Sequence, residues 1–265
     1  MAPPNTKASG SRIKTTTSNW LPATLFAVVL MALWELLART LDVQPWLLPA
    51  PTDIAGELVD SFSLHMGEAW ITIQEILIGF LFAGLLGASL AAAISWSKVI
   101  ERAVYPIVIA SQTIPIITLA PLLLIWVGPE ITSKVIVVVL ISFFPVVVSL
   151  VDGLKSADDD MTSMMRTLGA SKVQLLVKLK LPASLPYLFS GLKVAAVTSV
   201  IGAVVGEWVG GSGGLGWLMK VSGPQFKTDR VFAAIFVLSV VAVLLFALVV
   251  ITERWALRHH GPRGR

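Results

Sequence analysis

Long apolar stretches recur along this sequence and constrain its fold more than any other feature. A helix needs about 20 mainly apolar residues to cross the hydrocarbon core of a membrane. Six stretches reach or approach that length: 20–41, 69–94, one that ends near 127, 135–151, 190–209 and 231–251. Only 14% of the 265 residues are charged, whereas an average soluble domain has about a quarter. We therefore predict an all-α integral membrane protein with six transmembrane helices. This composition excludes an ordinary soluble enzyme, a disordered chain and a disulfide scaffold.

The positions of the positive charges predict how the chain is oriented in the membrane. With the N-terminus in the cytoplasm, fifteen of the 20 Lys and Arg residues fall in segments on the cytoplasmic side. Cytoplasmic loops of membrane proteins carry such an excess, so we predict that both termini lie inside. The formal net charge of +4 is then a consequence of topology, and nucleic-acid binding is not expected.

On this interpretation the chain divides into four segments. They are a disordered cytoplasmic tail (1–19), the first transmembrane helix with an extracytoplasmic segment (20–65), a core (66–256) that contains a cytoplasmic loop (155–187), and a second cytoplasmic tail (257–265). A basic start followed by an apolar run is also typical of a cleavable signal peptide. Here the run is too long, contains Glu35 and lacks a clean small-residue cleavage site, so we predict a retained span.

Small residues recur at every fourth position of the second span, at Gly79, Ala83, Gly87 and Ala91. This spacing puts them on one face of a helix, where they allow another helix to approach closely. A chance alignment in a helix rich in Ala and Gly is the alternative. Three prolines interrupt the third span, Pro106, Pro115 and Pro121. Because proline removes a backbone hydrogen bond, we expect this span to be kinked.

The cytoplasmic loop carries the signals of two short helices. Asp158, Asp159 and Asp160 can cap the first helix and complement its dipole, and Gly169 supplies a turn after it. Ser171 and Gln174 form a capping box that starts the second helix, which we expect Pro182 to end. A helical hairpin that lies on the membrane surface is one alternative. A DNA-binding helix-turn-helix is another, but the spans that hold both ends of the loop disfavour it.

This loop resembles the EAA loop of the permeases of ATP-binding-cassette (ABC) importers, and the chain is most similar to the nitrate, sulfonate and taurine group. The spacing from Gly169 to Leu181-Pro182 matches the family pattern. The resemblance assigns coupling to the ATPase subunit to Arg166, Leu168, Gly169, Ala170, Ser171, Leu181 and Pro182. Ser163, Met164 and Met165 stand where the family has Glu-Ala-Ala. The resemblance therefore carries over the turn and its spacing, but not the contact made by that Glu.

The resemblance implies a type I ABC importer permease fold with six spans, both termini inside and a cytoplasmic coupling helix. The core at 66–256 would be the permease core and 155–187 its coupling loop. The implied partners are ABC ATPase subunits at the cytoplasmic face, an extracytoplasmic substrate-binding protein and a second permease copy, in the cytoplasmic membrane of a prokaryote. The sequence contains no Walker A motif, so we expect a non-catalytic subunit, without cofactor or metal, whose partner hydrolyses ATP.

Two stretches point to a class of substrate. Residues 74–80 and 206–216 are more similar to the permeases that import riboflavin or thiamine-precursor pyrimidines. We therefore expect a small heterocyclic nutrient, with riboflavin first and the pyrimidine second. A permease for nitrate, taurine or alkanesulfonate is the alternative. A proton-coupled secondary transporter that uses Glu75 or Glu207 as a relay is a more remote one.

Polar residues inside apolar stretches are candidates for lining the translocation pathway, because such residues are costly at membrane depth. They are Glu75, Ser111, Gln112, Thr113, Glu207 and Trp208. For the two acids, a structural role near the outer interface is the alternative. For Trp208 the alternative is that of an interface anchor.

Other patterns in the sequence do not indicate a catalytic or metal site. Gly211, Gly213 and Gly216 fit the spacing G-x-G-x-x-G, but no strand precedes them, so a flexible loop is expected. Ser212 lies in a run that resembles an intramembrane serine-protease motif, but we expect no span to contain a His that could act as base. The sequence has 3 His and no Cys, which disfavours a metal site and excludes a thiol nucleophile.

Overall fold

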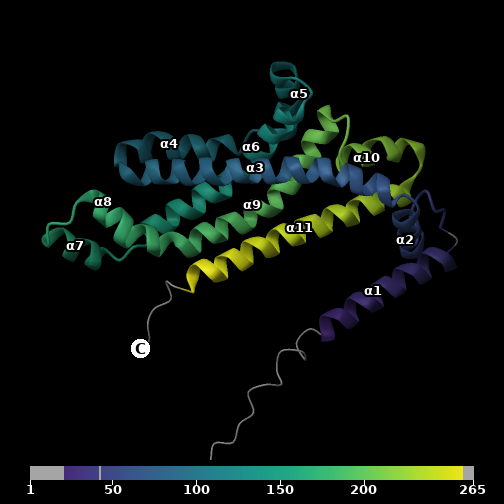
Figure 1. The fold of residues 1–265 in the computed structure, drawn as a ribbon, viewed down its shortest axis with the longest axis horizontal. Coiled ribbons are helices and arrows are strands. Elements are labelled where there is room, and N and C mark those ends of the chain that lie inside the picture. The colour runs from purple at the N-terminus through teal and green to yellow at the C-terminus, as the bar shows by residue number, and fades with distance from the viewer. Residues whose placement is uncertain (1–20, 42, 259–265) are drawn as a thin grey trace, which may run out of the picture.

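The computed structural model describes residues 21–41 and 43–258, and its regular structure is entirely helical (Figure 1). The long helices are α1 (Leu21–Thr40), α3 (Phe62–Trp96), α6 (Ile131–Lys155), α9 (Leu181–Gly210) and α11 (Thr228–Leu257). The shorter ones are α2 (Pro51–Asp60), α4 (Lys98–Ser111), α5 (Ile116–Val127), α7 (Asp159–Thr167), α8 (Lys172–Leu175) and α10 (Leu215–Ser222), with a π-helical turn η1 (Leu176–Lys180) and a 3-10 turn η2 (Gly223–Gln225). The all-α prediction is confirmed. The predicted tail 1–19 and residues 259–265 of the predicted tail 257–265 lie outside the described residues.

Five helices of the described chain are long and apolar enough to cross a membrane, and the bent pair α4–α5 makes a sixth span if it is counted as one. This pair corresponds to the predicted third span, but its two halves meet at 96°. Only Pro115 lies at the break, whereas Pro106 and Pro121 lie inside their helices. Pro115 disfavours a helical conformation at the residue before it, which ends the helical run there.

The predicted small-residue face of α3 packs against α6, as expected. Gly79, Ala83, Gly87 and Ala91 are all buried. A methyl group added at Gly87 would lie 2.8 Å from the Cβ of Val146 in α6, so the two helices meet almost backbone to backbone. Helix α6 packs along both α3 and α9, and this trio forms the centre of the fold.

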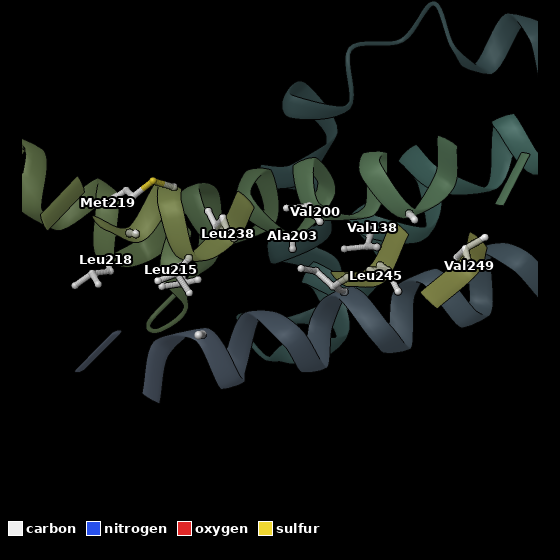
Figure 2. Packing of buried hydrophobic residues seen from close by; sticks show 14 residues of the cluster. Val138, Val200, Ala203, Leu215, Leu218, Met219, Leu238, Leu245 and Val249 are labelled. Atoms are coloured by element: carbon white, nitrogen blue, oxygen red, sulfur yellow. The ribbon is translucent and has the colours of Figure 1, made fainter. Parts of the chain in front are cut away.

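A second layer of apolar packing joins α10 and α11 to this centre (Figure 2). Val138 of α6 and Val200 of α9 belong to the same buried cluster as Leu215 of α10 and Leu238 of α11. Although α10 has only 8 residues, five of them are buried. This short helix is therefore held in the core and does not lie loosely on the outer surface.

The close approach of α9 to α6 gives a testable prediction at Gly191. A Cβ at this position would lie 2.8 Å from the carbonyl oxygen of Pro145 and 3.0 Å from the Cα of Val146. Because backbone atoms cannot move aside cheaply, we expect Gly191→Leu to destabilise the protein by about 3 kcal/mol. The measurement is the melting midpoint in detergent. The matched control is Gly56→Leu in α2, where nothing lies within 4 Å of an added Cβ. Equal melting midpoints for the two variants would contradict the close approach.

Charged contacts connect α1, α2 and α11 at the end of the bundle predicted to be extracytoplasmic. Glu35 of α1 accepts hydrogen bonds from the backbone N–H and the hydroxyl of Thr52 (3.1 and 2.8 Å). Glu57 of α2 pairs with Arg230 of α11 at 2.6 Å. Burial raises the pKa of Glu57, but hydrogen bonds from Arg230 and Ser61 outweigh it and hold this pKa below its usual value. Elsewhere α1 is largely exposed and lies apart from the other long helices (Figure 1).

Candidate functional site

The cytoplasmic loop folds into two capped helical segments joined by a glycine turn, as predicted. The Asp158 carboxylate accepts from the N–H of Asp160 at 2.8 Å and starts α7. Gly169 has a φ of +80°, a conformation that glycine adopts without strain. After the turn, Ser171 and Gln174 form the reciprocal capping box that starts α8. The turn is thus closed by backbone hydrogen bonds from Gly169 and Ala170 on the side of α7 and by the Ser171 cap on the side of α8.

An exposed apolar face runs along α7 to the tip of the loop. Met161, Met164 and Leu168 are 46%, 57% and 76% exposed. Their spacing places them on one side of the helix. Met164 belongs to the triplet that departs from the family pattern, and the structure puts it on this face. Sequence reasoning missed the face, although the spacing of the three apolar residues could have revealed it.

The prediction that Pro182 ends the second helix is wrong. α8 continues through the π-helical turn η1 into α9. Residues 172–210 therefore form one helix that is long and apolar enough to cross a membrane. The N–H of Leu181 donates to the carbonyl of Leu176, five residues earlier, and Pro182, which has no N–H, directly follows this wider turn. The predicted coupling residues are therefore divided between two places. Arg166 through Ser171 lie at the loop, and Leu181 and Pro182 lie at the start of the span.

Two of the predicted pathway residues meet at a buried cluster of charged side chains. Glu75 of α3 and Glu207 of α9 are both fully buried. Lys134 of α6 places its Nζ 3.0 Å from a carboxylate oxygen of Glu75, and its charge also acts on Glu207. The buried ion pair agrees with the alternative considered for these acids, a structural role. Sequence reasoning missed Lys134, which it treated only as an extracytoplasmic charge.

Glu207 also holds the first turn of α10. One carboxylate oxygen accepts from the hydroxyl of Thr72 at 2.6 Å, and the other accepts from the N–H of Gly216. The N–H of Leu215 donates to Thr72 at 2.8 Å, and that of Gly214 donates to Glu68. A helix leaves its first N–H groups without internal partners, and here side chains of α3 and α9 accept from them.

The glycines of the loop before α10 make room for the Glu207 carboxylate. Gly214 has a φ of +101°, and a Cβ there would collide with the carboxylate. A Cβ on Gly216 would lie 2.6 Å from one of its oxygens. The G-x-G-x-x-G glycines thus lie at a turn between helices, as expected, but this turn is packed against Glu207 and is not the flexible loop that was predicted. The polar residues 68, 72 and 75, spaced by four and three in an apolar helix, were the sequence signal for this network.

The remaining predicted pathway residues lie at other places in the fold. Ser111, Gln112 and Thr113 lie at the break between α4 and α5, where the hydroxyls of Ser111 and Thr113 each donate to a backbone carbonyl at 2.7 Å. Gln112 is exposed. Trp208 is 48% exposed, and its carbonyl accepts from Lys220.

The expectation that no span contains a His is also wrong. His65 lies in the first turn of α3 and is fully buried. Its Nδ1 lies 3.0 Å from the carbonyl oxygen of Ser61. The apolar run by itself suggested a later start for this span, because the first turns of α3 contain polar residues. Among the described residues, no group of three or more His, Asp or Glu side chains is arranged to hold a metal ion.

Comparison with known proteins identifies the family. Residues 76–258 match the family described as the binding-protein-dependent transport system inner membrane component. The chain belongs to this family. It is 44% identical over 230 residues to the formylaminopyrimidine transport permease protein ThiX of Halalkalibacterium halodurans, covering 86% of this chain and 92% of the relative. It is 32% identical to the riboflavin transport system permease protein RibX of Chloroflexus aurantiacus, covering 90% and 87%.

The fold matches that of a solved ABC importer. The inward-facing structure of the MetNI methionine ABC transporter superposes with a TM-score of 0.64 at 19% identity, covering 76% of this chain and 98% of that one. The chain is therefore the multi-pass, non-catalytic permease of a bacterial ABC importer, located in the inner membrane. Binding-protein-dependent transport implies that it works with ATPase subunits and a substrate-binding protein.

Proposed function

We propose that this permease carries a thiamine-precursor pyrimidine into the cell. The observation that carries this proposal is its 44% identity, over most of both chains, to a formylaminopyrimidine permease, against 32% to a riboflavin permease. The higher identity to the pyrimidine permease reverses the order of candidate substrates that residues 74–80 and 206–216 suggested. Riboflavin becomes the second candidate, followed by nitrate, taurine or an alkanesulfonate.

The energy for transport enters through the loop that contains α7 and α8. The residues from Arg166 to Ser171 dock on an ATPase subunit, with the exposed face of Met161, Met164 and Leu168 as the contact surface. The helix that continues from Lys172 to Gly210 carries the displacement across the membrane. Leu181 and Pro182 lie within it, beside the π-helical turn. Glu207, near the far end of this helix, passes the displacement to α10 through Gly216.

Two copies of the chain enclose the translocation pathway. The α4–α5 break supports this assignment, because irregular backbone at membrane depth needs protein or a water-filled cavity beside it. Gln112 and Thr113 are exposed at this break, and α5 rises above the long helices while it packs against α6 and α9 (Figure 1). Ser111 and Trp208 line the same pathway. Glu75 and Glu207 lie behind it as a charged layer that holds α3, α6 and α9 in register.

The decisive experiment is uptake by the complete transporter, reconstituted in vesicles with its binding protein. We expect ATP-dependent uptake of a labelled aminopyrimidine that excess unlabelled pyrimidine blocks and excess riboflavin, taurine or nitrate does not. A binding protein that co-purifies with bound flavin, visible by its yellow colour and fluorescence, would overturn the proposed substrate. Uptake that collapses with a protonophore at constant ATP would instead favour a secondary transporter.

A further inference from the structure

A cavity of about 740 Å³ opens at the cytoplasmic end of the bundle, between the loop and the ends of the spans. The end of α3, the start of α4, the end of α6 and the segment from α8 to η1 form its walls. Its charged lining residues are Lys98, Glu101, Lys155, Arg166, Lys172 and Lys180. Leu168 and Gly169 at the tip of the loop do not line it, whereas Arg166 of α7, at the edge of the proposed docking segment, does.

The cavity has a large excess of positive charge. Its single acid, Glu101, is paired with Lys155 at 2.5 Å. Within residues 21–41 and 43–258, the other four cations of the lining form no ion pair. Four cations around one cavity create a positive potential that attracts an anion, although water and salt screen their mutual repulsion. A phosphate group, which offers several acceptor oxygens to Lys and Arg, suits this arrangement.

Features of the lining place the cavity at the level of the membrane surface. Trp96, the last residue of α3, is 49% exposed there, and Trp is typical of the membrane–water interface. Ser95 has a buried hydroxyl for which the described residues provide no hydrogen-bond partner. The 14-residue helix α4 begins at the same wall, with the positive end of its dipole at the cavity.

We propose that this cavity binds the headgroup of an acidic phospholipid from the cytoplasmic leaflet. Basic pockets between span ends on this side of a membrane recognise such headgroups. The phosphate meets Lys98 at the start of α4 together with Lys172 and Lys180 from the loop. The lipid thereby connects the ends of the spans to the segment that receives the movement of the ATPase. The inference does not depend on which substrate is transported.

The test counts bound lipid on the purified transporter, with its ATPase subunits, by native mass spectrometry. Phosphatidylglycerol is titrated against phosphatidylcholine and against soluble glycerol phosphate. We expect retention of about one phosphatidylglycerol per permease, and weaker binding by roughly fivefold for each cation removed, so about 25-fold for Lys98→Gln/Lys180→Gln. The matched control is Lys178→Gln, an exposed residue of the same segment that does not line the cavity.

Several outcomes would overturn the proposal. They are equal retention of phosphatidylcholine, equal binding of soluble glycerol phosphate, and equal lipid retention by the double variant and Lys178→Gln. Loss of the lipid when the ATPase subunits assemble would assign the cavity to that protein interface instead. Lys98→Arg/Lys180→Arg keeps both charges and must retain the lipid. This variant keeps the test decisive if the Gln variants fold poorly.

Discussion

Gly169→Asp is expected to reduce ATP-driven uptake by about 100-fold while the protein still inserts and folds. The turn at Gly169 has a φ of +80° and nothing within 4 Å of an added Cβ, so the side chain projects into open space. If the turn docks on an ATPase subunit, that space is filled by the partner. A carboxylate forced into a protein interface without a counter-charge costs several kcal/mol, which corresponds to about this loss. Uptake and co-purification of the ATPase subunit measure the two effects separately.

Gly169→Asn is the matched control for this prediction. Asn and Asp both tolerate a positive φ and have nearly the same shape, so they place the same strain on the turn. Only the charge differs between the two variants. We expect Gly169→Asn to keep much more uptake and ATPase binding than Gly169→Asp. If the Asp variant binds the ATPase subunit and transports as well as the Asn variant, the docking role of this turn is incorrect.

Lys134→Met is expected to destabilise the protein by about 3–5 kcal/mol, because it leaves a buried carboxylate unpaired. In the described part of the chain, Lys134 is the sole ion-pair partner of Glu75, which is fully buried. Replacing both charges with apolar side chains removes the unpaired charge. We therefore expect Glu75→Leu/Lys134→Met to recover most of the lost stability. Melting midpoints of the three variants in detergent, including Glu75→Leu alone, measure this coupling.

The same double variant tests whether the buried charges serve transport. If Glu75 and Lys134 only hold α3 against α6, a stable double variant transports normally. If their charges also act on the translocation pathway itself, uptake falls by at least about tenfold although the protein melts like the wild type. A double variant no more stable than Lys134→Met alone would show that the two residues do not act as a pair.

Local sequence patterns predicted much of the fold and of the loop. Span positions follow from the length of apolar runs, and the face of α3 that carries Gly79 and Gly87 follows from a four-residue spacing. The caps at Asp158 and Ser171 depend on residues within one turn of each other, so they could be read directly. The expected end of the helix at Pro182 was wrong. A π-helical turn before Pro182 lets the helix continue, and no local sequence pattern predicted that turn.

The charged cluster could not be predicted in the same way. Thr72 and Glu207 are 135 residues apart, and their contact depends on how α3 and α9 are rotated against α6. Polar residues at 68, 72 and 75 mark one face of α3, but a spacing does not say which helix covers that face. Lys134 was taken for an exterior charge because positive-inside counting does not distinguish a surface cation from a buried one.

The sequence by itself determined that this chain crosses a membrane, which side its loops face and where its glycine turn lies. These properties depend on neighbouring residues along a helix, whose geometry is the same in every protein. Only the tertiary structure showed that Glu75, Lys134 and Glu207 share one site, that α8 and α9 form one continuous helix, and that unpaired cations surround a cavity. Those arrangements depend on packing between helices, which is set by close approaches such as that of Gly191 to Pro145.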